Sequence, residues 1–120
     1  MVNGVCFGAT GQVTASNRLL DRPLGLKWAK AIHKLKPEFE KLEDVVVQFD
    51  AKKKDSYDGP FLAYFADVTV KEGDKQHQLR LPGGYENDYH TFVKWALKEA
   101  TQFKEKMAEL AKLKGELGAK

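Results

Sequence analysis

The chain has 120 residues, of which 42% are hydrophobic and 31% charged, a balance typical of one soluble globular domain with a single core. No apolar run approaches the roughly 18 residues that a membrane span needs, and the single cysteine, Cys6, excludes a secreted disulfide scaffold. The net charge of +3 is uneven, because residues 1–37 hold six basic residues against one acidic residue. This excess predicts an anionic partner for the N-terminal third, with a solvated helix face and a loose tail as the alternative.

Residues 1–23 are rich in Gly, Ser, Thr and Asn, which predicts an extended N-terminal arm. Residues 1–20 contain one arginine and no acidic residue, a composition weakly similar to that of a mitochondrial targeting segment. The alternative is that this segment is not cleaved and is retained as an arm. The run from Gly8 to Gly11 begins like a dinucleotide-binding turn, whose glycines let the backbone approach a pyrophosphate. Thr14 occupies the third glycine position, so a glycine-containing arm is favoured, and a small nucleotide-binding enzyme is the leading enzyme alternative.

The first helix is predicted from about Leu26 to Leu42, because apolar residues recur there at steps of three and four. That stripe consists of Trp28, Ile32, Leu35, Phe39 and Leu42. Pro37 lacks a backbone N–H, so it is expected to kink the helix or to begin a new turn. The strand that follows, Val45 to Phe49, is apolar on nearly both faces, which predicts that it is covered on both sides.

A hairpin is predicted after a polar loop over residues 51–60. Its strands run from Phe61 to Val70 and from Gln76 to Leu81, joined by a turn at Glu72-Gly73-Asp74. The whole series of one helix, one strand and a hairpin is typical of an α+β domain.

The last helix is predicted to begin near Asp88, with Asn87 or Asp88 as its cap. Its apolar stripe continues to Leu117, and at about 1.5 Å per residue such a helix is longer than a domain of this size requires. We therefore expect residues 24–103 to form the domain and residues 104–120 to project as a helical extension. The residues predicted to bind a protein neighbour are Phe103, Met107, Leu110 and Leu117.

The sequence predicts no catalytic, cofactor-binding or metal site. His33, His77 and His90 lie on different predicted elements and lack the spacing of metal ligands. No second cysteine joins Cys6, and no nucleophile is placed beside a base and an acid. Surface positions are the favoured interpretation of all three histidines.

Phosphate groups are one kind of anion that the basic residues are suited to contact. Lys52, Lys53 and Lys54 form the densest basic cluster, although Asp55 and Asp58 beside them are also typical of a solubilising loop. The residues predicted to contact RNA are Arg18, Arg22, Lys27, Lys30, Lys52, Lys53 and Lys54.

Residues 26–100 resemble the thioredoxin-like domain shared by certain mitochondrial ribosomal proteins and a small accessory subunit of respiratory complex I. The resemblance rests on the order of helix, strand, proline-ended loop, hairpin and helix. Two motifs are more specific: Pro37 followed by Phe39 and the valine strand, and Pro60-Phe61-Leu62 leading into Tyr64-Phe65. Together with the extension from Lys104 to Leu117, they resemble the small-ribosomal-subunit branch.

This resemblance implies a thioredoxin-like small sheet with flanking helices, an extended N-terminal arm and a long C-terminal helix. Glu43-Asp44 stands where the family often has Asn-Pro, and the first strand is Val2 to Phe7 or Gln12 to Ala15. The implied function is a non-enzymatic structural subunit of the mitochondrial ribosome in the matrix, of the small subunit, without cofactor, small-molecule substrate or membrane insertion. Its partners would be ribosomal RNA and neighbouring ribosomal proteins, and an accessory subunit of complex I is the alternative.

Overall fold

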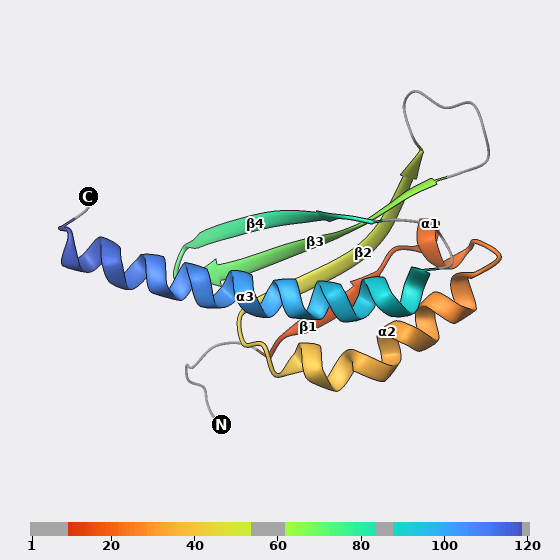
Figure 1. Cartoon of the computed structure of the whole chain (residues 1–120), viewed down its shortest axis with the longest axis horizontal. Coiled ribbons are helices and arrows are strands. Elements are labelled where there is room, and N and C mark those ends of the chain that lie inside the picture. The colour runs from red at the N-terminus through yellow and green to blue at the C-terminus, as the bar shows by residue number, and fades with distance from the viewer. Residues whose placement is uncertain (1–9, 54–61, 84–87, 119–120) are drawn as a thin grey trace.

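The computed structural model describes residues 10–53, 62–83 and 88–118, which form a mixed sheet with helices packed on it (Figure 1). The predicted α+β class, with a small mixed sheet, flanking helices and a long C-terminal helix, is confirmed. The elements are β1 (Gln12–Ala15), α1 (Asn17–Leu20), α2 (Gly25–Glu40), β2 (Val45–Lys53), β3 (Leu62–Glu72), β4 (Lys75–Pro82) and α3 (Tyr89–Glu116).

The four strands lie in the order β1-β2-β3-β4. The first two strands are parallel, and each of the remaining neighbours is antiparallel. Residues paired across the strands share a face, so the register builds continuous apolar rows such as Val13, Val47, Val68 and Leu79. The long helices α2 and α3 lie side by side over this face and run in the same direction from the same end of the molecule (Figure 1).

Trp28 lies at the centre of the core between the helices and the sheet. It is 1% exposed and stacks on Tyr64 of β3, with 5.4 Å between ring centroids. Its ring also meets the rings of Tyr89 and Phe92 on α3, at 6.2 and 6.0 Å. One indole thus joins both helices and the sheet, and it fixes how α2 and α3 lie relative to each other.

The prediction that β2 is covered on both faces is wrong for the part of the chain that the structure describes. Val45, Val47 and Phe49 are buried under the helices, whereas Gln48 is exposed and Val46 is half-buried on the opposite face. None of the described helices lies over that second face (Figure 1). Strand β2 therefore alternates between buried residues and residues on the open face, and one of the open-face positions is a valine.

The predicted extended arm needs correction over residues 12–20, which form β1 and α1 and belong to the domain. Leu19 of α1 is 1% exposed in the core. Ser16 begins α1, because its hydroxyl accepts a hydrogen bond from the backbone N–H of Leu19 at 3.3 Å and donates to Asp50 on β2. The first strand is therefore Gln12–Ala15, one of the two positions left open by the sequence.

The helices keep most of their predicted bounds. Helix α2 ends at Glu40, two residues before the predicted Leu42, and continues through Pro37, which is exposed. Asp88 holds the N-cap position of α3 without a capping hydrogen bond from its side chain, and Asn87 lies outside the described residues. No described helix combines the length and the apolar character needed to cross a membrane.

Gly11 has a structural role that differs from the dinucleotide-binding turn. It precedes β1 instead of joining a strand to a helix, and its N–H donates to the carbonyl oxygen of Glu40 at 3.1 Å. A Cβ atom there would lie 2.2 Å from the carbonyl oxygen of Phe39. Gly11 therefore packs the start of β1 against the end of α2. This position gives no support to the nucleotide-binding alternative.

Gly11→Ala is expected to lower the free energy of unfolding by about 1–3 kcal/mol, because backbone atoms of α2 must move to admit the methyl group. Urea denaturation followed by circular dichroism measures this loss. Gly115→Ala is the matched control, since a Cβ atom there meets nothing within 4 Å and alanine favours a helix by about 0.5–1 kcal/mol. Equal stability of the Gly11 variant and the parent would contradict the close packing of β1 on α2.

Candidate functional site

Two stripes of basic side chains lie on the exposed surfaces of the long helices. The α2 stripe consists of Lys27, Lys30 and Lys34, and the α3 stripe consists of His90, Lys94 and Lys98. Spacings of three and four residues place the members of each stripe on one side of their helix, one turn apart. All six residues are exposed.

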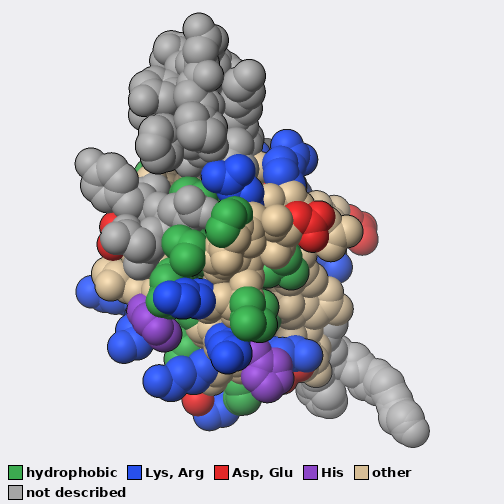
Figure 2. Space-filling view, turned by 90° about the vertical axis from the view of Figure 1, so that its right-hand side faces the viewer, with side chains coloured by type: hydrophobic (Ala, Val, Ile, Leu, Met, Phe, Trp, Pro, Cys, Tyr) green, Lys and Arg blue, Asp and Glu red, His purple; other side chains and the backbone are tan. Residues whose placement is uncertain are grey.

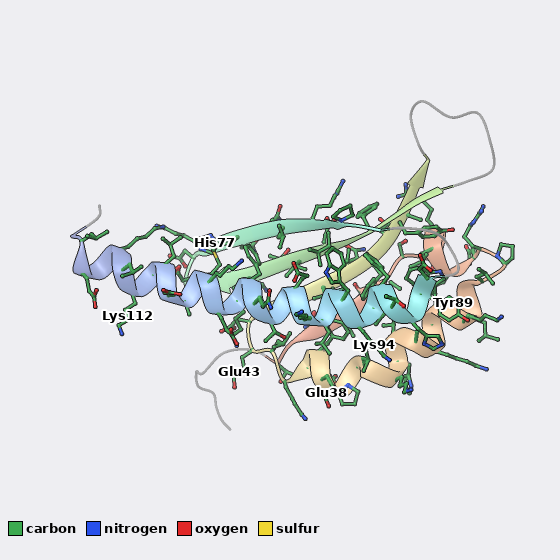
Figure 3. The ribbon with its side chains drawn as sticks, viewed as in Figure 1. Glu38, Glu43, His77, Tyr89, Lys94 and Lys112 are labelled. Atoms are coloured by element: carbon green, nitrogen blue, oxygen red, sulfur yellow. The ribbon has the colours of Figure 1, made fainter. Side chains whose placement is uncertain are left out.

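The fold brings the two stripes to the same end of the molecule. Helices α2 and α3 begin there and run in parallel (Figure 1), and Figure 3 places Lys94 on the side of α3 next to α2. Viewed onto that end, Lys, Arg and His side chains gather over the helices with few acidic side chains among them (Figure 2). Since packed helices lie roughly 8–10 Å apart, one ligand can contact both stripes.

The charges of the stripes are not neutralised within the described parts of the chain. Residues 22–37 contain no acidic residue, and the ion pairs that the structure gives involve other cations, such as Arg18, Lys41 and Arg80. Like charges one helical turn apart destabilise a helix by about 0.2–0.5 kcal/mol per pair. An anionic ligand would relieve this repulsion, so the stripes are suited to bind one.

The residues predicted to contact RNA are only partly brought together. Lys27 and Lys30 belong to the α2 stripe. The Arg18 side chain is 62% exposed, and its Nε lies 3.7 Å from the Asp50 carboxylate; Arg22, in the turn between α1 and α2, is half-buried. Lys52 and Lys53 are the last residues of β2, whose tip reaches the end where the long helices begin (Figure 1), and Lys54 lies outside the described residues.

The α3 stripe was not among the residues predicted from the sequence. The sequence feature that could have revealed it is the spacing of His90, Lys94 and Lys98. The last helix also contains acidic residues, so its overall charge looked balanced. Only the packing of α3 beside α2 joins the two stripes into one surface.

The residues predicted to bind a protein neighbour divide into two groups. Phe103 and Met107 pack against the core, and Met107 also lines a shallow groove with Ala111 and the α2–β2 turn. Leu110 is 40% and Leu117 81% exposed. The helix therefore stays against the domain as far as Ala111, which corrects the predicted boundary at residue 104.

The open face of the sheet carries a polar cluster of its own. Arg80 on β4 donates two hydrogen bonds to the Asp67 carboxylate, at 2.8 and 3.1 Å, and lies 4.2 Å over the Phe65 ring. These hydrogen bonds and the negative charge of Asp67 raise the pKa of Arg80. The two charges of the cluster are paired with each other, and the pair joins β3 to β4 across the strands.

The histidines do not come together. His33 and His90 are exposed on different helices, and His77 Nε2 on β4 lies 3.3 Å from the Glu72 carboxylate. Within the described residues, no three His, Cys, Asp or Glu side chains form a group that could hold a metal ion.

Comparisons of the chain with protein-family models, with curated proteins and with solved structures find no match. The likeness to mitochondrial ribosomal proteins accordingly stays a prediction from the motifs around Pro37 and Pro60. The surface formed by the two stripes is a property of this chain that can be tested directly.

Proposed function

We propose that the chain is a non-enzymatic structural subunit of a ribonucleoprotein and binds RNA through the α2 and α3 stripes. The assembly that its motifs favour is the small subunit of the mitochondrial ribosome, which would place the protein in the mitochondrial matrix. The observation that supports this proposal is the pairing of two exposed basic stripes on parallel helices, whose lysines are not in the ion pairs that the described residues form. The apolar residues at the end of α3 would contact a protein neighbour in the same assembly.

Phosphate is the ligand chemistry that fits these side chains. Lysine carries a compact charge on a flexible stem, which binds phosphate oxygens without requiring a fixed geometry. Such contacts release condensed counterions from the nucleic acid, so they supply sequence-independent affinity that falls steeply with salt. A structural RNA subunit uses contacts of this kind to fix its position on the RNA.

The triple variant Lys27→Gln, Lys30→Gln, Lys34→Gln is expected to weaken RNA binding and to make it less salt-dependent. Each lost phosphate contact lowers the slope of log affinity against log salt by about 1, so the slope should fall by about 3. Fluorescence anisotropy with labelled RNA between about 50 and 200 mM salt measures both effects. The stripe residues are exposed, so the fold should be unaffected.

The matched control is Lys71→Gln, Lys75→Gln, Lys106→Gln. It removes the same charge from exposed positions away from the end where α2 and α3 begin. If both triple variants weaken binding equally, net charge and not the α2 stripe attracts RNA.

Sedimentation of the native assembly tests the wider proposal. The protein is expected to co-sediment with ribosomal RNA of the small subunit. Co-sedimentation with a membrane-bound respiratory complex that lacks RNA would instead establish the accessory subunit of complex I.

A further inference from the structure

We infer that the RNA bound by the two stripes is an A-form double helix, contacted on the phosphates of both strands across one groove. This inference rests on the proposed function, which makes RNA the ligand, and it adds the form of RNA that the surface selects. Three properties of the surface carry it: the number of stripes, their length and their chemistry.

The geometry of the stripes matches two strands better than one. From Lys27 to Lys34 the α2 stripe extends about 10 Å, and from His90 to Lys98 the α3 stripe extends about 12 Å, at 1.5 Å per residue. Each stripe is therefore long enough to contact several consecutive phosphates of one strand. Two rows that run side by side correspond to two strands that border a groove.

The chemistry of the stripes is dominated by ammonium groups and contains few groups that read single-stranded bases. Single strands are held by aromatic rings on which the bases stack, combined with a basic groove. Five of the six stripe residues are lysines and none is Phe, Tyr or Trp, so the His90 imidazole is the one ring in the stripes on which a base can stack. The exposed aromatic residue on the same stretch of α3 is Trp95, which is 37% exposed and not part of either stripe.

The stripes also lack the planar side chains Arg, Asn and Gln that read base edges by paired hydrogen bonds. Lysine can also contact guanine edges in a major groove, but the deep, narrow major groove of A-form RNA keeps side chains away from them. Lysine ammonium groups act as point charges towards phosphate. A surface of this kind recognises shape and backbone, which is how proteins recognise A-form RNA across its wide, shallow minor groove.

Fluorescence anisotropy of the full chain with three probes tests this inference. The probes are a mixed-sequence RNA duplex of about 20 base pairs, one of its strands alone, and the DNA duplex of the same sequence. At about 100 mM salt we expect the RNA duplex to bind about tenfold more tightly than the single strand or the DNA. The variant Lys27→Gln, Lys30→Gln, Lys34→Gln and the variant Lys94→Gln, Lys98→Gln should each weaken duplex binding about tenfold.

Trp95→Ala separates duplex binding from base stacking. We expect it to leave affinity for the RNA duplex within about twofold of the parent, because each stacked base is worth about 1–3 kcal/mol and none is stacked here. A single strand that binds as tightly as the duplex, or a large loss in Trp95→Ala, would overturn the duplex inference while RNA binding stands. Equal affinity for duplex DNA would overturn the selection of A-form geometry, and failure to bind any of the probes would reject the proposed function itself.

Discussion

Replacing Trp28 by alanine is expected to lower the free energy of unfolding by about 3–5 kcal/mol. The indole is 1% exposed and contacts the rings of Tyr64, Tyr89 and Phe92, so its removal leaves a cavity where α2, α3 and the sheet meet. Native domains are stable by only about 5–15 kcal/mol, and the variant would therefore be largely or partly unfolded near physiological temperature. The midpoint of urea denaturation, followed by far-ultraviolet circular dichroism, measures the loss.

Trp95→Ala provides the matched control for this prediction. Trp95 is 37% exposed, and the ring contact that the structure gives it is with Phe92, at 5.8 Å between centroids. The same chemical change should therefore cost about 1 kcal/mol or less. Similar losses in the two variants would contradict the placement of Trp28 at the centre of the core.

Loss of Trp28 should also affect the candidate site. The ring holds α2 against Tyr89 and Phe92 at the start of α3. Lys27 and Lys30 of the α2 stripe lie close to Trp28 in sequence, and His90 of the α3 stripe follows Tyr89. A variant that is still folded but loosely packed would present the two stripes without a fixed spacing. Duplex RNA binding is therefore expected to fall more than single-strand binding in any folded fraction of Trp28→Ala.

The elements with strong periodicity could be predicted from the sequence. Trp28, Ile32 and Phe39 recur at helical spacing and are all buried, because a stripe of that width must face the core. Gly73 marked the hairpin turn correctly, and its φ of +60° explains why glycine is suited to that position. The local sequence pattern was sufficient to predict an element wherever one of its faces is fully apolar.

The short elements near the N-terminus could be predicted only in part, because the sequence left two positions open for the first strand and did not indicate α1. Strand β1 has four residues, and Gln12 and Thr14 alternate with Val13 and Ala15 in a segment whose composition is typical of a loop. It is a strand because its register against β2 pairs Val13 with Val47, a contact between residues far apart in sequence. Polar composition indicated an arm, and long-range pairing overrode that signal.

The candidate site was predictable in part, for a related reason. The absence of acidic residues between positions 22 and 37 is a feature of the sequence alone, and it pointed to Lys27 and Lys30. Lys94 and Lys98 gave no such signal, since Glu99 and Glu105 follow them closely in sequence. The sequence shows the charge distribution of each helix separately. A binding surface also depends on which helices pack together, and the charge pattern does not show this.

Two truncations of α3 are expected to separate folding from docking. Removal of residues 112–120 should change the free energy of unfolding by less than about 1 kcal/mol, because Leu113 and Leu117 are 43% and 81% exposed. Removal of residues 105–120 should cost about 2–3 kcal/mol, because it also deletes Met107, which packs on the core, and Ala111, which lines the adjacent groove. Urea denaturation of the two purified chains measures this difference.

The shorter truncation then tests whether exposed leucines attach the protein to a neighbour. Leu113 and Leu117 lie one turn apart at the end of a helix that has left the domain, and an exposed apolar stripe of this kind marks a partner surface. The chain without residues 112–120 should fold and bind RNA normally, yet enter its assembly at reduced occupancy, as quantified by mass spectrometry of the purified particle. If it enters at full occupancy, the α2 and α3 stripes are sufficient for attachment. If it fails to fold, the last turns of α3 belong to the core, and the division at Ala111 is wrong.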